Sequence, residues 1–354
     1  MNPPYDLAVN LPLRAAVADR LTASLRGVTV GADLLGYPPM AGGLAVREAI
    51  AAWLRRHAGH GAVDPRRLVL TLGARHALSL ALAETCGPGD TLLMEALTYH
   101  GFRAGAQARG VRVQGVAMDH EGMLPDALDQ MAAESGARTV YIQPTLQNPT
   151  TATMTLARRH DILAVAARRD LTIIEGDVYS PLAWHGGDAL PALADLDPVR
   201  CLHAGGMGKI LGPGLRIGWL LLPDEASHQR AAEAIRLGTD GLPALLPSIV
   251  AGWIADGTAD DLLVSLVEDM RGRHALARSV LGPAVVGDAG LHVWLPTGDA
   301  VGIEERALAR GVRVTPSRAL AANGQDARGV RLALGAEEDV GRLGEALRVL
   351  AGCF

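Results

Sequence analysis

The hydrophobic pattern alternates between strand-like and helical periods from about residue 44 to residue 222. Short apolar runs rich in Leu, Val and Ile predict buried strands, whereas apolar residues three to four positions apart predict amphipathic helices. We expect strands at 68–72, 91–95, 111–116, 139–144, 171–175, 200–204 and 217–222. We expect helices at 44–57, 74–86, 100–109, 124–134 and 156–169. Buried strands that alternate with helices indicate a mostly parallel sheet covered on both faces, the doubly wound α/β architecture.

The pattern changes after about residue 225. Residues 225–280 have helical periodicity, with a long amphipathic segment from residue 259. Short strands are predicted further on, among helices, near 291–295, 312–314 and 329–334. This change predicts a second, smaller α+β domain. We place a large α/β domain at residues 36–224 and a small α+β domain at residues 1–35 plus 225–354.

Composition agrees with a globular protein of about two domains, because the chain has 354 residues of which 49% are hydrophobic and 20% charged. The net charge is −5, and no Lys/Arg tract is interleaved with aromatic residues. The electrostatic pattern that nucleic-acid binding requires is therefore missing. The N-terminus has no basic start followed by an apolar core, and no apolar run reaches the roughly 20 residues of a membrane span.

The three cysteines also bear on location and metal binding. Cys86, Cys201 and Cys353 are scattered, without a second cysteine or a histidine at metal-ligand spacing. This usage predicts a reducing, cytoplasmic environment and no metal site.

Candidate chemistry lies on loops that follow buried strands, the edge at which open α/β sheets bind ligands. Lys209 lies in GGMGKILGPGLRIGW, directly after a strand. The glycines allow a ligand to approach the backbone, and a desolvated lysine can lose its proton and become a nucleophile. A solvated lysine in a flexible turn is the other interpretation of this segment alone.

Further segments have the same placement at strand ends or at helix starts. They are QPTLQNPTT (143–151), IIEGDVYSPL (173–182), TLGARHAL (71–78), MEALTYHG (94–101), LGYPPMAGGLAVREA (35–49) and RGVRLALG (328–335). The Gly73 segment opens a helix, whose N-terminal N–H groups bind anions. Each segment alone also has a structural interpretation, such as an Asn-Pro turn, a core tyrosine or a surface arginine.

Together these segments resemble the class I/II aminotransferases, enzymes of fold type I that depend on pyridoxal 5'-phosphate (PLP). The lysine segment is similar to the family's S-x-S-K or S-x-A-K followed by PG-x-R-x-G. The others follow in the family's order and span residues 37 to 331. The resemblance implies a PLP-dependent transferase-like fold with a large doubly wound sheet domain and a smaller α+β domain.

The resemblance also implies a role for each matching residue. Lys209 would form the Schiff base with PLP and carry protons, and Arg331 would bind the substrate α-carboxylate. Ala74, Arg75 and Arg216 would hold the phosphate, Tyr99 would stack on the ring, and Asn148 and Tyr179 would contact the phenolic oxygen. Asn148 would also reach the substrate carboxylate. Tyr37 would reach the phosphate of a neighbouring subunit, which implies a homodimer.

Two departures from the family pattern affect these expectations. Gly206 and Gly208 replace the usual serines before the lysine, so their hydroxyl contacts to phosphate are absent. The acid that normally pairs with the pyridine nitrogen falls on Gly176, and Asp177 comes one residue late. Because successive strand side chains point to opposite faces, Asp177 is expected to point away from the ring unless the strand bends. We hypothesise a weakened electron sink and an enzyme specialised away from ordinary transamination.

Three functions remain in consideration. The first is an aminotransferase that exchanges an amino group between an α-amino acid and a 2-oxo acid. The second is a PLP-dependent lyase, for example for β-elimination or decarboxylation of a specialised amino acid. The third is a non-catalytic amino-acid sensor of the kind fused to a helix-turn-helix, which we do not expect because only 36 residues precede Tyr37. Residues 9–12 and 98–103, including His100, would line the side-chain pocket and fit many substrates.

Overall fold

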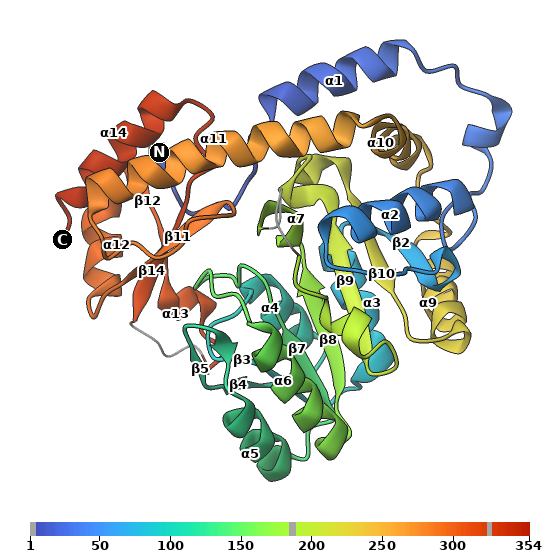
Figure 1. Cartoon of the computed structure of the whole chain (residues 1–354), viewed down its shortest axis with the longest axis horizontal. Helices are drawn as coiled ribbons and strands as arrows, with labels where there is room; N and C mark the ends of the chain where they lie inside the picture. Colours follow the sequence, from blue (N-terminus) through green and yellow to red (C-terminus); the bar gives the residue numbers. More distant parts are fainter. Residues whose placement is uncertain (1–4, 184–188, 324–327) are drawn as a thin grey trace.

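The computed structural model describes residues 5–183, 189–323 and 328–354, and a seven-stranded sheet is the largest feature of this part (Figure 1). The strand order is β2-β10-β9-β8-β7-β3-β4. The strands are β2 (Leu68–Leu72), β3 (Thr91–Glu95), β4 (Arg112–Val116), β7 (Thr139–Ile142), β8 (Thr172–Asp177), β9 (Cys201–Gly206) and β10 (Ile217–Leu221). Only β10 runs antiparallel to its neighbours in this sheet. The predicted mostly parallel α/β sheet is confirmed.

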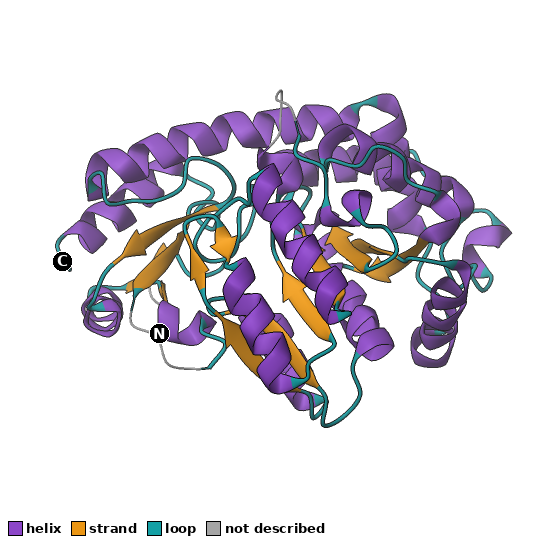
Figure 2. Cartoon of the chain, turned by 60° about the horizontal axis from the view of Figure 1, so that its bottom comes forward, coloured by secondary structure: helices purple, strands orange, loops and turns teal. Residues whose placement is uncertain are grey.

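Helices pack against both faces of this sheet (Figure 2). One face contacts α3 (Ala74–Thr85) and α4 (His100–Ala108), and the other contacts α5 (Pro125–Ser135), α6 (Leu156–Arg169) and α8 (Leu193–Leu196). Strand alternation divides the core accordingly, so that Ile174 and Ile173 belong to different hydrophobic clusters. The helices α2 (Leu44–His57) and α9 (Glu225–Thr239) extend the first layer.

A smaller antiparallel sheet follows in the last third of the chain. Its strand order is β11-β14-β13, and a two-stranded parallel pair joins β1 to β12. These strands are β11 (His292–Pro296), β14 (Gly329–Ala333), β13 (Thr315–Pro316), β1 (Tyr5–Asp6) and β12 (Val312–Arg313). The helices of this region are α10 (Leu245–Asp256), α11 (Thr258–Leu281), α12 (Ala300–Ala309), α13 (Ser317–Leu320) and α14 (Val340–Ala351). Figure 1 shows α11 running below α1, above the small sheet and towards α10.

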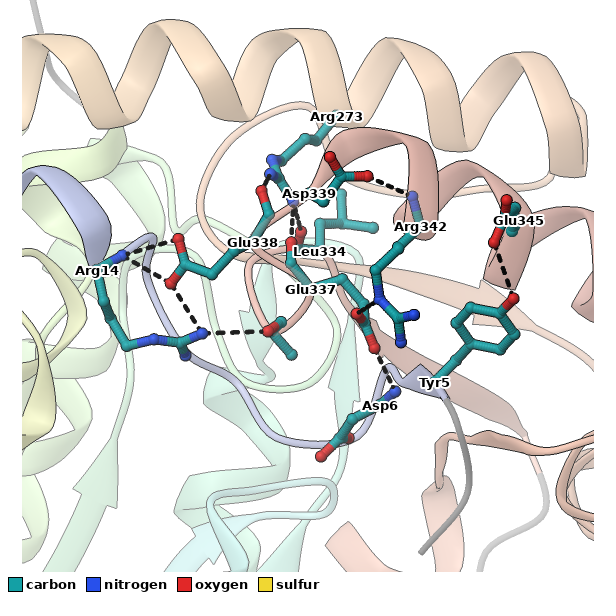
Figure 3. A network of polar contacts seen from close by, with 11 residues as sticks. Tyr5, Asp6, Arg14, Arg273, Leu334, Glu337, Glu338, Asp339, Arg342 and Glu345 are labelled. Atoms are coloured by element: carbon teal, nitrogen blue, oxygen red, sulfur yellow. Dashed lines mark hydrogen bonds and ion pairs between the residues drawn. The ribbon is translucent and has the colours of Figure 1, made fainter.

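The N-terminal segment is held by polar contacts against α14, the loop between β14 and α14, and the small sheet (Figure 3). The Tyr5 hydroxyl donates to Glu345 at 2.9 Å, and the Asp6 N–H donates to Glu337 at 2.9 Å. Leu7 then exchanges backbone hydrogen bonds with Arg313 and Ala333 at 2.8 and 2.7 Å. These contacts fix the direction in which the next residues, including Asn10, enter the interior.

Two strand ends differ from the prediction for local reasons. The strand expected at 139–144 ends at Ile142, because the Gln143 N–H donates to the Glu95 carboxylate at 2.9 Å and Pro144 has no N–H. The strand expected at 200–204 continues to Gly206, because β10 offers Gly218 as a partner.

The helix α1 (Ala15–Arg26) was not predicted, although it has 12 residues. Several short elements were not predicted either, namely the β5 (Met118–Asp119) and β6 (Gly122–Met123) hairpin, α7 (Ser180–Ala183), α8, η1 (Ala32–Leu35), η2 (Pro65–Arg67), η3 (Met207–Lys209) and η4 (Pro213–Leu215). Within the described residues, no helix is both long and apolar enough to cross a membrane.

Candidate active site

A cavity of about 540 Å³ lies at the carboxyl ends of β7, β8 and β9. The loops after these strands, the start of α3 and α4, the N-terminal segment and the small sheet all contribute to its lining. Seven of the predicted cofactor- and substrate-binding residues line it, namely Ala74, Arg75, Tyr99, Asn148, Tyr179, Lys209 and Arg331. The fold therefore gathers in one place residues that are up to 257 positions apart, from Ala74 to Arg331. Val9, Asn10, Leu11 and His100, from the segments expected at the side-chain pocket, line it as well.

Lys209 ends the single turn η3, which follows β9 directly. Its Nζ donates a hydrogen bond to the backbone oxygen of Asn10 at 2.5 Å. Burial, and to a lesser extent the positive charge of Arg331, lower the pKa of Lys209 to about 8. About a tenth of this amine is consequently neutral at pH 7, far more than for an ordinary lysine, and a nucleophile or base requires this neutral form.

The composition holds a further signal on Lys209, independent of its sequence motif. Of the 33 basic Lys and Arg residues, Lys209 is the only lysine, and the other 32 are arginines. Arginine does not lose its proton in proteins, so it cannot act as an amine nucleophile. The one lysine of the chain lies in the cavity.

The start of α3 forms an anion cradle beside Lys209. Gly73, before the first residue of α3, has a φ of +78°. The neighbouring strand β10 packs so closely against this point that a Cβ on Gly218 would lie 2.7 Å from the Ala74 nitrogen. A Cβ on Gly206 would lie 3.1 Å from the same nitrogen. The glycine that replaces a serine at 206 therefore allows close contact between β9 and the helix start.

Arg216 completes this cradle from outside the cavity lining. It donates to the backbone oxygen of Leu72, and its guanidinium lies 3.5 Å from the Cβ position of Gly73. Helix N-terminal N–H groups with a nearby guanidinium suit a phosphate.

Arg331 lies on β14 and is 4% exposed. Its Nη1 donates to the Asn148 side-chain oxygen at 2.8 Å, and its Nη2 donates to the backbone oxygen of Ala8 and to Thr315. Its Nε has no hydrogen-bond partner within the described part of the chain. A buried guanidinium whose hydrogen bonds go to neutral groups is suited to bind an incoming carboxylate.

Tyr179 has two polar neighbours, Asn10 and His292, whose contacts with it were not predicted. The Asn10 amide donates to the Tyr179 hydroxyl at 2.8 Å and lies 3.0 Å from Nδ1 of His292. Burial raises the pKa of Tyr179 and lowers that of His292, so both are neutral. Because the Tyr179 oxygen accepts from Asn10, its own proton is available to a ligand in the cavity. Asn10 is the polar residue of the apolar VNLP segment, and that contrast is the signal that could have identified it.

Asp177 supports the turn that carries Tyr179. One carboxylate oxygen accepts from the backbone N–H groups of Tyr179 at 3.3 Å and Ser180 at 3.0 Å, and the other lies 3.4 Å from Nε2 of His203. Burial alone would raise the pKa of Asp177, but the contacts with His203 and Ser180 outweigh it and bring the value to about 2. Asp177 is thus a buried, ionised carboxylate whose oxygens are already engaged.

Tyr37 and His76 lie outside the cavity, whereas His100 lies inside it. Tyr37 is 84% exposed and does not line the cavity of its own chain. His100 lines the cavity, whereas His76 accepts a hydrogen bond from the Leu72 N–H at 3.1 Å and has a structural role. Among the described residues, no group of three or more His, Cys, Asp or Glu side chains could hold a metal ion.

Comparisons with known proteins agree with this geometry. The sequence profile of the family "Aminotransferase class I and II" matches residues 3–345. The 2-aminoadipate transaminase of Thermus thermophilus is 30% identical over 341 residues, which cover 90% of this chain and 83% of the relative. An archaeal alanine:glyoxylate aminotransferase structure has a TM-score of 0.87 at 25% identity, covering 98% of this chain and 90% of that one.

A regulatory protein also resembles the chain. The uncharacterized HTH-type transcriptional regulator YdfD of Bacillus subtilis is 28% identical over 296 residues, which cover 80% of this chain. The chain spans between 33% and 60% of the length of the first curated relatives that it matches.

Proposed function

The chain belongs to the aminotransferase class I and II family, and from this premise we propose that it is a PLP-dependent aminotransferase. It would exchange an amino group between an α-amino acid and a 2-oxo acid. The observation that carries this proposal is Lys209, the single lysine of the chain, buried in the cavity with a lowered pKa and near the buried Arg331.

The residues of the cavity fit PLP in size, charge and donor chemistry. The α3 start with Arg75 and Arg216 would hold the phosphate, and Lys209 would bind the aldehyde. Asn148 and Tyr179 would donate to the phenolic oxygen, and the Tyr99 ring would cover one face of the pyridine. When bound, PLP supplies a carbonyl that takes up amino groups and a ring that accepts electron density from the substrate Cα.

The protein's own groups position the substrate and move its proton. The Arg331 guanidinium binds the α-carboxylate in a fork geometry, and Asn148 orients that guanidinium. Lys209 Nζ, neutral above about pH 8, takes the proton from the substrate Cα. The Asn10 backbone oxygen holds Nζ in place.

We extend the proposal to domains and subunits. Residues 36–224 would form the cofactor-binding domain, and residues 1–35 with 225–354 a smaller domain that closes on the substrate. The chain would act as a homodimer, in which the exposed Tyr37 side chain reaches the phosphate of the neighbouring subunit. The exposed apolar side chains of Val30 and Leu35 beside it, 58% and 81% exposed, support an interface at this segment.

A second candidate function is a PLP-dependent lyase, favoured by one observation, the glycine at position 176 where an acid is expected. A weaker electron sink suits a substrate whose own leaving group helps to stabilise the reaction. The similarity to YdfD makes amino-acid sensing without turnover the third outcome to be tested.

The deciding experiment incubates PLP-loaded protein with a panel of α-amino acids and one 2-oxo acid acceptor, followed by mass spectrometry of the products. Appearance of the matching 2-oxo acid and of the acceptor's amino acid, in equal amounts, supports transamination. Release of ammonia, thiol or carbon dioxide supports the lyase. Binding without any product at full cofactor loading supports the sensor.

A further inference from the structure

The floor of the cavity is built from residues inside the strands. Tyr141 on β7, Gly176 on β8 and Ala204 on β9 line it, whereas Asn148, Tyr179 and Lys209 follow the ends of the same strands. Tyr141 pairs with Ile174, and Gly176 pairs with Ala204. Because side chains alternate with period two, these residues share one face of the sheet.

The covalent structure of PLP determines which of its atoms would face this floor. The aldehyde carbon and the ring nitrogen occupy opposite positions of the pyridine ring, and the phenolic oxygen lies next to the aldehyde. With the aldehyde at Lys209 and the phenolic oxygen at Asn148 and Tyr179, the nitrogen would point away from the strand ends. It would therefore face the floor formed by Tyr141, Gly176 and Ala204.

The Tyr141 ring occupies the space that a side chain at position 176 would need. A Cβ on Gly176 would lie 2.5 Å from the Tyr141 hydroxyl oxygen and 2.6 Å from its Cε2, closer than any real contact. Tyr141 is 2% exposed and packs edge-on against Phe102, with ring centres 4.6 Å apart. Within the described residues, its hydroxyl forms no hydrogen bond, although it lines the cavity.

Asp177, the nearest carboxylate in sequence, is the last residue of β8 and also borders the cavity, but strand alternation places its side chain on the face opposite to Gly176. It shares that face with Glu175, whose strand partner is His203. Its oxygens are engaged by Tyr179, Ser180 and His203. A carboxylate held in this way is not available to the ring nitrogen without breaking the turn that carries Tyr179.

We propose that the Tyr141 hydroxyl donates a hydrogen bond to the ring nitrogen of PLP, in the space left by Gly176, and that this nitrogen is unprotonated. A carboxylate stabilises a protonated ring nitrogen by its negative charge, whereas a neutral phenol does not. Burial raises the pKa of Tyr141 well above its usual value, so the phenol keeps its proton and remains a donor. The electron sink of this protein is consequently weaker than that of a site with a carboxylate.

This inference rests on the proposed function, because it supposes that PLP binds in the cavity through Lys209. The test uses full-length protein loaded with PLP labelled with 15N in the ring, whose resonance separates protonated, hydrogen-bonded and free ring nitrogen. The wild-type resonance should be that of an unprotonated, hydrogen-bonded nitrogen near neutral pH.

Two single variants assign the partner. Tyr141→Phe keeps the ring packing and should move the resonance to that of a free pyridine nitrogen. It should also weaken PLP binding about tenfold, or about 1.4 kcal/mol, the order expected for one neutral hydrogen bond. Asp177→Asn should leave the resonance where it is in the wild type.

A double variant, Tyr141→Ala with Gly176→Asp, exchanges the phenol for a carboxylate and should give a protonated nitrogen. An unprotonated nitrogen in the folded double variant would contradict the assignment of position 176. A protonated nitrogen in the wild type, no change in Tyr141→Phe, or a change in Asp177→Asn would each overturn the inference while PLP binding stands. Failure of the wild type to bind PLP would overturn the proposed function and this inference with it.

Discussion

Replacing Arg331 by lysine keeps a positive charge in the cavity but removes the guanidinium fork. In the structure this guanidinium donates to Asn148, Ala8 and Thr315, and its Nε is unpartnered among the described residues. A substrate carboxylate would engage two of these N–H groups at once. A lysine ammonium is a point charge on a flexible stem and offers one directed hydrogen bond in the same place.

The expected magnitude follows from the loss of one charge-assisted hydrogen bond in a buried site. Such a bond contributes roughly 1.5–3 kcal/mol, and 1.4 kcal/mol corresponds to about a factor of ten. We therefore expect Arg331→Lys to raise KM for an α-amino acid by about 10- to 150-fold. We expect kcat to change little, because the carboxylate is held equally in the ground and transition states.

The assay compares the binding of an amino acid with that of the corresponding amine without a carboxylate, using the absorbance of PLP-loaded protein. Arg331→Lys should weaken the binding of the amino acid and leave the binding of the amine unchanged. Arg273→Lys is the matched control, because Arg273 is also 4% exposed but donates to backbone oxygens of Leu334, Glu337 and Glu338 outside the cavity (Figure 3). It should lower the melting temperature and leave KM unchanged. An unchanged KM in Arg331→Lys, or an equal penalty for the amine, would refute the assignment.

Three other predictions concern pH, subunits and stability. The rate at which apo-protein forms lysine-linked PLP can be followed by trapping with borohydride. This rate should rise with pH and level off above about pH 8, because the pKa of Lys209 is lowered to that value. A rate that keeps rising to pH 10 would contradict this. Mixed dimers of Lys209→Ala and Tyr37→Ala chains should regain one functional site, whereas each variant alone has none. A mixture no more active than the two separate variants would argue against a shared site. Asp177→Asn should lose about 2 kcal/mol of unfolding free energy at pH 7 in urea titrations, because the native pKa of about 2 lies below the ordinary 3.8. Since the pKa is lowered, the wild type should lose this stability as pH falls from about 4 to 2 and the variant should not.

The strands of the large sheet could be predicted because their burial on both faces gives continuous apolar runs. The β8 segment illustrates this, since Ile173 and Ile174 pack into different clusters on opposite faces. The pairing of β1 with β12 could not be predicted, because it joins two-residue segments about 307 positions apart that have no periodicity of their own. The expectation that residues 9–12 line the pocket is confirmed, since Val9, Asn10 and Leu11 lie in the cavity, but the contact of the Asn10 side chain with Tyr179 was not predicted.

The candidate site could be predicted at residues whose functional groups and sequence motifs indicate a role. Lys209, Asn148, Tyr179 and Arg331 come from separate segments, and the cavity brings them together. Tyr141 was unpredictable from the sequence, because an apolar strand with a tyrosine looks like core. Only the register between β7 and β8 shows that its ring takes the place of a side chain at Gly176.

The most direct test of the account is the site at which PLP becomes attached. PLP-loaded protein is reduced with borohydride, digested and mapped by mass spectrometry, and the unique lysine of the chain makes the assignment unambiguous. The account predicts one pyridoxyl group per chain, on Lys209, and none in Lys209→Arg protein. A protein that remains unmodified, or that carries the group on the N-terminal amine alone, would contradict it.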